Sequence, residues 1–511
     1  MFSRIMFTIH RVLGTLLSVL FLMWFVSGIV MIYHGFPSAG RDEKAAKLEP
    51  LDTDLPSVDE LARRLPDTCT IDELSVSRYL GQTVYEIRSG KETFRLPADS
   101  AEQLPIIDGA YIARVAALWC SAPVSRIDSL HALDQWIPFG RLKEEFPIYK
   151  FHFADHDGTE LYISSRSGEV LQYTTRSERL WAWVGAVPHW VYFTLLRQDR
   201  ELWIKTVIWL SGVGAIMVIA GLYVGIYVSV KSRRRKKKWF PYKKKWYYWH
   251  HVTGIVFGLF ALTWVFSGMM SLADPPEWLV KEHQKYPVRQ TMEALAPSPA
   301  AYPLDYKALI SQYDGRAIEI RWSHFFGLPT YEIVLSGAER LTIDATTAQP
   351  LALTEAQATE AVRRIHGDDA VIRTEQLNEY DTYYLDRKRR LELPVWKVSV
   401  ENEDRSCYYI TPSNGRLREY NTRRRTHFWM YSALHALRFK FLTEHPVLWT
   451  TVMWMLLLGG AFVSLSGVVL GVKYIVRLFR RKARRTAARK GKKNLWKSHY
   501  HRFFLYHCCR P

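Results

Sequence analysis

The stretch TIHRVLGTLLSVLFLMWFVSGIVMIY, residues 8–33, decides the fold because the chain contains a second version of it. Residues 248–273 read YWHHVTGIVFGLFALTWVFSGMMSLA and follow at an offset of 240, so that His10 matches His250. Each version holds an apolar run of about 20 residues, which is enough to cross a bilayer as a helix. Each run also has one histidine near its start. The sequence therefore predicts a repeated membrane helix that carries a repeated histidine.

Two further apolar runs, 203–229 and 448–475, match each other at an offset of 246. Both contain glycines four positions apart, and such glycines let helix backbones approach closely in lipid. The glycines are Gly221 and Gly225 in the first run and Gly467 and Gly471 in the second. Together the four runs predict a membrane protein whose four-helix transmembrane core arose by tandem duplication.

The net charge of +19 is concentrated directly after apolar runs, in residues 231–245 and 473–497. Basic residues in this position follow the positive-inside rule and favour contact with anionic membrane lipids. The rule assigns both termini and the 231–247 loop to the cytoplasm and the two long connecting segments to the outside. Because the basic residues flank membrane spans, we expect no nucleic-acid partner.

The two outside segments also resemble each other. Residues 147–173 match residues 394–420 at an offset of 247, and both runs alternate apolar and polar residues as strands do. Each run has a turn that closes on a glycine suited to positive φ, Gly168 or Gly415. Helical patterns precede the runs, at 56–65, 109–119 and 354–366. We therefore expect two extracytoplasmic α+β domains, each with a helix packed on an antiparallel sheet.

These patterns predict a linear order of domains. In chain order they are 1–34, the first transmembrane helix; 35–178, the first outside domain; 179–230, an interfacial helix and the second transmembrane helix; 231–247, a basic cytoplasmic loop; 248–273, the third transmembrane helix; 274–425, the second outside domain; 426–476, an interfacial helix and the fourth transmembrane helix; and 477–511, a basic cytoplasmic tail.

Four histidines occupy matching positions beside the membrane: His10 with His250, and His189 with His435. Topology puts the first two at the cytoplasmic side and the last two at the outer side, and the repeat predicts that each pair faces across a pseudo-twofold axis. Two facing imidazoles are the axial ligands of a six-coordinate haem iron. Alternatively, the histidines lie at headgroup level and bind lipid or water.

Other residues compete for these roles. His251 is adjacent to His250, and His34 and His427 are alternatives on the outer side. The chain has no CxxCH motif, so covalently attached haem is excluded. A group of outer arginines is expected to pair with haem propionates, to guide an anionic chelate or to bind lipid phosphates. These are Arg176, Arg179, Arg423, Arg424, Arg425 and Arg438.

Several smaller features have weaker implications. His152, Asp155 and His156 are spaced loosely for a metal site. The run 401–404, Glu-Asn-Glu-Asp, is expected to be a solvated turn. Among the cysteines, one bridge between Cys69 and Cys120 would be allowed in an oxidising compartment. The adjacent Cys508 and Cys509 suit a lipidation site, a redox site or a frayed tail.

The segments from His10 to Gly28 and from His250 to Gly268 share an H-x-x-x-G start and a later W-x-x-S-G, and they resemble the PepSY-associated transmembrane family. The strand endings SGEVL and NGRL resemble PepSY domains. Within this family the chain looks like the FoxB-like siderophore-iron reductases of the bacterial inner membrane. That resemblance implies two b-type haems, a ferric siderophore or other iron chelate as substrate in the periplasm, and an electron donor that the sequence does not identify.

The same resemblance leaves a second function open. PepSY domains are also associated with the regulation of peptidases, so the alternative is a non-enzymatic membrane protein. In that case the outside domains would bind or regulate extracytoplasmic peptidases or other ligands.

Overall fold

The computed structural model describes residues 1–66, 69–313 and 315–507, and Cys508 and Cys509 lie outside this part. The chain forms two compact units, and each unit takes segments from both halves of the sequence. The first unit consists of Met1–Tyr33, Thr206–Met269 and Thr450–Pro511, and the second of His34–Lys205 and Met270–Trp449.

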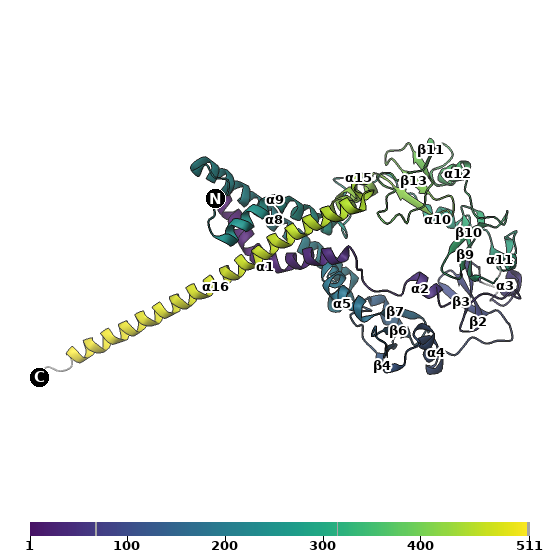
Figure 1. The fold of residues 1–511 in the computed structure, drawn as a ribbon, viewed down its shortest axis with the longest axis horizontal. Helices are drawn as coiled ribbons and strands as arrows, with labels where there is room; N and C mark the ends of the chain where they lie inside the picture. The colour runs from purple at the N-terminus through teal and green to yellow at the C-terminus, as the bar shows by residue number, and fades with distance from the viewer. Residues whose placement is uncertain (67–68, 314, 508–511) are drawn as a thin grey trace. The chain divides into compact units, whose positions relative to one another are not determined.

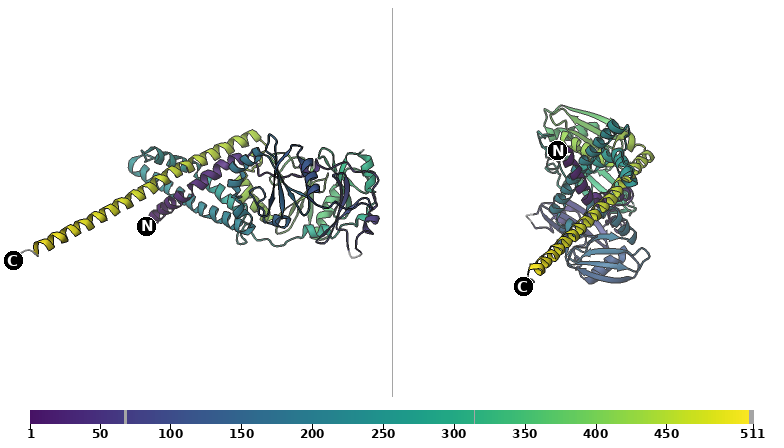
Figure 2. Two further views of the ribbon diagram at one scale, coloured as in Figure 1. Left: turned by 90° about the horizontal axis from the view of Figure 1, so that it is seen from below. Right: turned by 90° about the vertical axis from the view of Figure 1, so that its left-hand side faces the viewer.

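Four long helices dominate the first unit: α1 (Phe2–Met31), α8 (Arg200–Lys236), α9 (Lys245–Met270) and α16 (Pro446–His507). Each contains a window apolar and long enough to cross a membrane, so the chain is a multi-pass membrane protein. The helix α16 continues without a break beyond its apolar part to His507, through the segment predicted as a basic tail (Figure 2).

Glycines set the close approach of these four helices. A Cβ atom added at Gly214 of α8 would lie 3.0 Å from Phe21 of α1, and one at Gly460 of α16 would lie 2.5 Å from Phe25. The two glycines are at matching positions of the second and fourth apolar runs, at the predicted offset of 246. Small residues at helix contacts therefore let the aromatic side chains of α1 reach two neighbouring helices.

A six-stranded antiparallel sheet in the second unit combines strands from both outside segments (Figure 1). Its order is β10-β9-β8-β1-β2-β3. The strands are β1 (Glu73–Tyr79), β2 (Gln82–Ser89), β3 (Glu92–Pro97), β8 (Ala317–Phe325), β9 (Leu328–Leu335) and β10 (Arg340–Asp344).

The pairing of β1 with β8 differs from the predicted order of domains. The sequence predicts separate domains over 35–178 and 274–425, whereas Val76 of β1 pairs with Ile320 of β8. Each three-stranded meander has an edge with unpaired backbone groups, and joining the two edges satisfies them. The two outside segments therefore share one sheet.

Two four-stranded antiparallel sheets complete the second unit, and each is covered by one helix. The first sheet has the order β4-β5-β6-β7 and the second the order β11-β12-β13-β14. Their strands are β4 (Val124–Leu130), β5 (Ile148–Phe153), β6 (Glu160–Ser164), β7 (Val170–Thr174), β11 (Ile372–Leu377), β12 (Val395–Val400), β13 (Cys407–Ile410) and β14 (Leu417–Tyr420).

The covering helices are α4 (Gly109–Trp119) and α12 (Glu355–His366), as the helical patterns predict. The apolar face of α4 packs on β5 and β6 through Ile112 and Val115, and that of α12 packs on β12 and β13 through Ala358 and Val362. Gly168 and Gly415 have φ values of 69° and 64°, which confirms the predicted left-handed turns. Each repeated run forms three strands, β5–β7 in the first half and β12–β14 in the second.

The two four-stranded sheets differ by one β-bulge, which changes the strand register in the first sheet. In the first sheet Ile163 pairs with Val170 but Tyr162 pairs with Gln172, so Leu171 is an extra residue. In the second sheet Ile410 pairs with Leu417 and Tyr409 with Arg418, without an extra residue. Beyond this bulge the matching positions of the two halves differ by 246 instead of 247.

The remaining elements are short. They are α2 (Arg41–Ala45), α3 (Val58–Ala62), η1 (Gly140–Glu145), α5 (Arg176–Val184), α6 (Ala186–Trp190), α7 (Thr194–Arg197), α10 (Val288–Glu293), η2 (Pro299–Ala301), α11 (Tyr306–Gln312), α13 (Thr422–Phe428), the π-helical turn η3 (Trp429–Ala433), α14 (Leu434–Ala436) and α15 (Lys440–Thr443). The predicted interfacial helices are thus broken into several short pieces before α8 and before α16.

Candidate functional site

The helices α1 and α9 bring His10 and His250 together, and we call these residues the His10 pair. Their ring centroids are 6.0 Å apart, with 32° between the ring planes. His10 places its Nδ1 atom 3.2 Å from the backbone oxygen of Met217 in α8. A carbonyl oxygen only accepts, so Nδ1 carries the proton and Nε2 keeps its lone pair.

His250 has the same tautomer for a different reason. Its Nδ1 atom lies 2.8 Å from Oγ of Ser466 in α16, and that hydroxyl donates to the Val463 oxygen at 2.7 Å. The serine proton is thus already used, so Ser466 accepts from Nδ1 of His250. Metal-bound histidines are commonly held in this way, with the ring nitrogen that is not a ligand donating to an oxygen.

A glycine provides the space for the ring of His10. A Cβ atom at Gly221 of α8 would lie 2.6 Å from Cε1 of His10. At the matching position of α16, a Cβ atom at Gly467 would lie 3.7 Å from Cε1 of His250. The glycines expected to bring helices together thus also make room for the imidazole of His10.

The second pair, His189 and His435, lies in the second unit, and we call it the His189 pair. Its ring centroids are also 6.0 Å apart, with 59° between the planes. His189 is near the end of α6 and His435 near the end of α14, and both helices end in a left-handed residue. These residues are Val191, with φ of 56°, and Leu437, with φ of 48°.

Tryptophan side chains hold both of these turns. The indole N–H of Trp203 donates to the oxygen of Trp190 at 2.8 Å, and that of Trp449 donates to the oxygen of Ala436 at 2.9 Å. Trp190 and Ala436 directly follow the two histidines. Because helix ends leave carbonyls without intrahelical partners, each tryptophan fixes the chain where its histidine leaves the helix.

The alternative histidines contact other groups. His251 lies 2.9 Å from Oγ of Ser229, and His34 stacks on Trp181 with centroids 4.5 Å apart. His427 donates from Nε2 to the oxygen of Met270 at 2.9 Å. Of the predicted histidines, the structure therefore brings together the four at matching positions, as two pairs.

The spacing within both pairs can be compared with that of two imidazoles that bind one haem iron. Two imidazoles that share one iron have ring centres about 6 Å apart, because a metal–nitrogen bond is about 2 Å long and each ring centre lies about 1 Å behind its nitrogen. The distance of 6.0 Å in both pairs agrees with this requirement. The tautomers of the His10 pair also leave Nε2 of each ring as the metal-binding atom.

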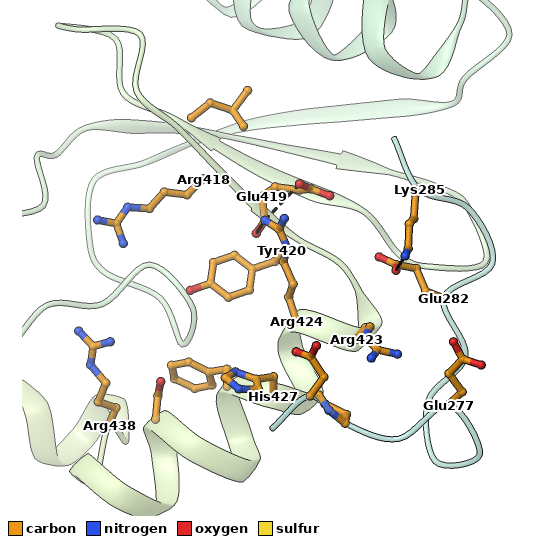
Figure 3. Close-up of a pocket in the computed structure, with 15 residues that line it drawn as sticks. Glu277, Glu282, Lys285, Arg418, Glu419, Tyr420, Arg423, Arg424, His427 and Arg438 are labelled. Carbon is orange, nitrogen blue, oxygen red and sulfur yellow. Dashed lines mark hydrogen bonds and ion pairs between the residues drawn. The ribbon is translucent and has the colours of Figure 1, made fainter. Parts of the chain in front are cut away.

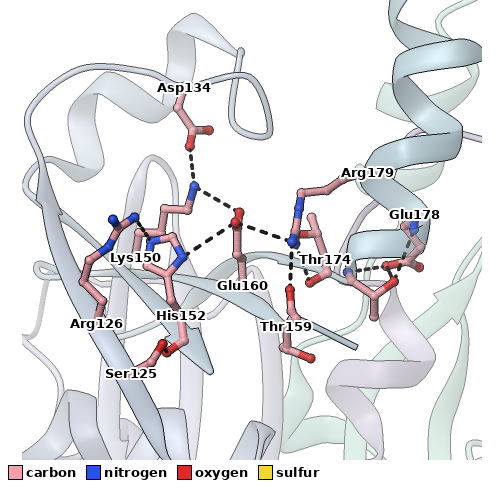
Figure 4. A network of polar contacts seen from close by, with 12 residues as sticks. Ser125, Arg126, Asp134, Lys150, His152, Thr159, Glu160, Thr174, Glu178 and Arg179 are labelled. Carbon is pink, nitrogen blue, oxygen red and sulfur yellow. Dashed lines mark hydrogen bonds and ion pairs between the residues drawn. The ribbon is translucent and has the colours of Figure 1, made fainter. Parts of the chain in front are cut away.

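The arginines predicted to meet propionates or a chelate divide into two groups. Arg179 is held within the first outside segment, where it donates to the oxygen of Gly158 at 2.8 Å and lies 3.5 Å from Glu160 (Figure 4). The arginines of the second half, among them Arg423 and Arg438, line a pocket that includes His427. Arg176 is exposed at the start of α5, and Arg425 lies outside the pocket, over the ring of Tyr383.

The acidic run 401–404 forms the expected turn, with Glu401 and Glu403 exposed, but Asp404 is buried. The carboxylate of Asp404 is 4% exposed, and it accepts from the backbone N–H groups of His283 and Gln284 at 3.0 and 2.9 Å. Burial alone would raise the pKa of Asp404, but these hydrogen bonds and the side chain of His283 lower it. The sequence pattern does not indicate that the carboxylate of Asp404 binds the distant segment that contains His283 and Gln284.

Two other expectations are corrected. Cys69 and Cys120 are free thiols without a bridge. His152 lies 2.8 Å from Asp128, whereas His156 is fully exposed, so the two histidines do not form one metal site. Among the residues that the structure describes, no group of three or more His, Cys, Asp or Glu side chains is arranged to hold a bare metal ion.

Comparison with known families agrees with the membrane helices and the sheets. The family described as the PepSY-associated TM region matches residues 121–368, slightly less than half of the chain. A comparison with curated proteins gave no match. The chain is therefore similar to this family over residues 121–368.

Proposed function

We propose that the protein is a haem-dependent reductase of the bacterial inner membrane that passes electrons to ferric iron chelates in the periplasm. The observation that carries this proposal is the spacing of the two histidine pairs, 6.0 Å between ring centroids in each. An imidazole in hydrocarbon is costly without a partner, but His10 and His250 already have partners in Met217 and Ser466, so this cost does not require the two rings to face each other.

In this proposal His10 and His250 hold one b-type haem and His189 and His435 hold the other. A haem with two imidazole ligands supplies a one-electron carrier that has no open coordination position. Met217 and Ser466 fix the tautomers of the first pair. Trp203 and Trp449 position the second pair, and the apolar helices exclude water.

The orientation of the protein in the membrane, and with it the proposed direction of electron transfer, follows from the basic residues beside the helices. The basic runs after α8 and within α16 favour a cytoplasmic location for these helix ends, which assigns the sheets to the periplasm. We infer that the halves arose by duplication, since the strand orders and the left-handed turns at Val191 and Leu437 match. In this proposal one histidine pair lies toward each face of the membrane, as the positive-inside rule predicts.

The visible spectrum of the purified protein tests the proposal. We expect a Soret band and sharp α and β bands on reduction, and two haems per chain. His10→Ala and His435→Ala should each remove about one haem, because each leaves one pair without a ligand. His156→Ala is the control, since this side chain is fully exposed. A colourless protein, or unchanged haem content in both variants, contradicts the proposal.

The competing function is a PepSY membrane protein without enzymatic activity that binds extracytoplasmic peptidases. A colourless protein would favour it.

A further inference from the structure

A cavity of about 760 Å³ lies in the second unit, between the segment 274–285, the strand β14 and the helix α13 (Figure 3). This volume is within the range of pockets that hold small molecules, roughly 300–1,000 Å³. Its walls are polar and charged. The ligand must therefore be one that brings charge or many hydrogen-bonding oxygens of its own.

One charge of the pocket has no ion partner in the part of the chain that the structure describes. Arg424 is paired with Glu419 at 3.1 Å, and Lys285 lies 3.9 Å from Glu282. Arg418 is exposed on β14 and has no ion pair within 4.0 Å among the described residues. Arg438, on the same side of the pocket, lies 4.0 Å from the Asp386 carboxylate and donates to the Leu385 oxygen at 3.4 Å, and the Tyr420 hydroxyl points between the two arginines (Figure 3).

The opposite side of the pocket carries charges of both signs. Glu277 and Glu282 of the segment after α9 lie there together with Lys285 and Arg423 (Figure 3), and Asp274 also lines the pocket. The pocket thus has one cationic wall and one wall of mixed charge. A ligand with anionic oxygens at one end and amide, amine or hydroxyl donors at the other would satisfy both.

This chemistry is absent from the matching positions of the first half. Beyond the bulge at Leu171 the offset is 246, so Arg418 corresponds to Gln172 and Arg438 to Tyr192. Gln172 is buried and donates to the oxygens of Pro37 and Trp136. The first half forms the same kind of sheet without arginines at these positions, so the fold alone does not explain the presence of Arg418 and Arg438.

The pocket also adjoins the His189 pair. His427 lines it, and the ring of His427 lies 5.9 Å from that of Tyr431, which lies 5.6 Å from that of His435. Arg438 follows His435 by three residues. A molecule bound in the pocket would therefore be separated from His435 by two aromatic rings.

We propose that this pocket binds the iron chelate, and that Arg418, Arg438 and Tyr420 select complexes with anionic catecholate or carboxylate oxygens. The idea rests on the proposed reductase function for its choice of ligand, but it concerns binding alone. Guanidinium groups and a phenol are the donors that recognise clustered anionic oxygens.

The test uses a gallium(III) complex of a tricatecholate chelator, which cannot be reduced, and measures its binding to the full-length protein by isothermal titration calorimetry. We expect Arg418→Gln to weaken binding about tenfold, the effect of losing one charge-assisted hydrogen bond. The double variant Arg418→Gln/Arg438→Gln should weaken it further. Arg373→Gln is the matched control, because Arg373 is an exposed arginine on β11 outside the pocket.

Three results would overturn the inference: wild-type affinity in Arg418→Gln and the double variant, equal weakening in Arg373→Gln, or displacement of the complex by equimolar inorganic phosphate. Phosphate displacement would assign the pocket to phosphate groups, including those of lipids. Loss of haem in Arg418→Gln would assign that arginine to a propionate instead. If a colourless protein binds the complex and the binding depends on the arginines, the pocket is supported and the reductase function is refuted. If the protein contains two haems but does not bind the complex, the reductase function is supported and the pocket is refuted.

Discussion

Single residues decide which ring nitrogen of His10 and His250 carries the proton. Met217 offers His10 a backbone oxygen, and Ser466 offers His250 a hydroxyl that is already committed to Val463. Both rings therefore carry the proton on Nδ1. Partners of this kind often change metal affinity 10- to 100-fold when they are removed, although they never touch the metal.

Replacing Ser466 by alanine should weaken haem retention in the His10 pair roughly 10-fold or more, because Nδ1 of His250 loses its acceptor. The measurement is the haem remaining after extended dilution, read from the Soret band. Ser464→Ala serves as the control, since Ser464 is buried in the same helix but donates only to the oxygen of Gly460. Equal haem retention in the two variants would show that Ser466 has no specific role in holding the haem.

A methyl group at Gly221 should displace the ring of His10, because it would lie 2.6 Å from Cε1. We expect Gly221→Ala to destabilise the protein by about 1–3 kcal/mol, the usual effect of overpacking, and to reduce haem content. Thermal unfolding and the reduced spectrum measure these two effects. Gly254→Ala in α9 should change neither, because a Cβ there would meet nothing within 4 Å.

Short helices and their ends position the His189 pair. The helices α6 and α14 are only five and three residues long, so their own hydrogen bonds do little to hold them. Both end in left-handed residues, a conformation that costs a non-glycine residue about 1–2 kcal/mol. The tryptophans at the start of α8 and α16 supply the compensating contacts.

Removing the indole N–H of Trp449 should loosen the turn after His435. We expect Trp449→Phe to destabilise the protein by about 0.5–1.5 kcal/mol, since the oxygen of Ala436 loses its donor, and to lower the haem content by up to one equivalent. The control is Trp209→Phe, because Trp209 is exposed on α8. A haem content that is unchanged in Trp449→Phe would argue against a positioning role.

The end of α12 makes the stability of its sheet depend on pH. His366 lies 2.7 Å from the Tyr408 hydroxyl and 3.8 Å from the ring of Tyr286, and burial lowers its pKa to about 4. In the unfolded chain this pKa is about 6.5. Protonation therefore favours unfolding, and this contribution to stability is complete above pH 6.5 and is lost as the pH falls toward 4.

Chemical denaturation between pH 7 and pH 4 measures this effect. We expect His366→Gln to flatten the decrease in unfolding free energy across that range, and His156→Gln to leave it as in the wild type. Parallel curves for the wild type and His366→Gln would contradict the assignment.

The molecule as a whole is interlocked, because neither unit can be completed from one half of the sequence. The first unit needs α1 and α8 together with α9 and α16, and the second needs β1 paired with β8. A break in the 237–244 connection between α8 and α9 would leave every one of these contacts intact.

Two separately encoded halves, cut within 237–244 and co-expressed, should therefore assemble and purify together through a tag on one of them. Val76→Asp in the first half should reduce this co-purification, since Val76 is fully buried and pairs with Ile320. Glu92→Asp, at the far edge of the same sheet, is the control. Halves that purify independently would refute the interlocked arrangement.

The sequence predicts what local periodicity and internal repetition encode. The four spans, the helices α4 and α12 and the left-handed glycines follow from apolar periods and turn residues. No local pattern in the sequence predicts the pairing of β1 with β8, because it joins two strand edges that are more than 200 residues apart in the chain. For the same reason the partners Ser466 and Asp404 could not be identified: a serine in a helix and an aspartate in a turn look ordinary until their neighbours are known.

The shared six-stranded sheet also has a consequence for biosynthesis. The strand β1 emerges from the ribosome long before β8, and at about 5–20 residues per second the delay is on the order of tens of seconds. During that interval an unpaired strand edge is open to any other extended chain nearby. Chains truncated before residue 317 keep this edge unpaired, and we expect them to aggregate more than the full-length protein does.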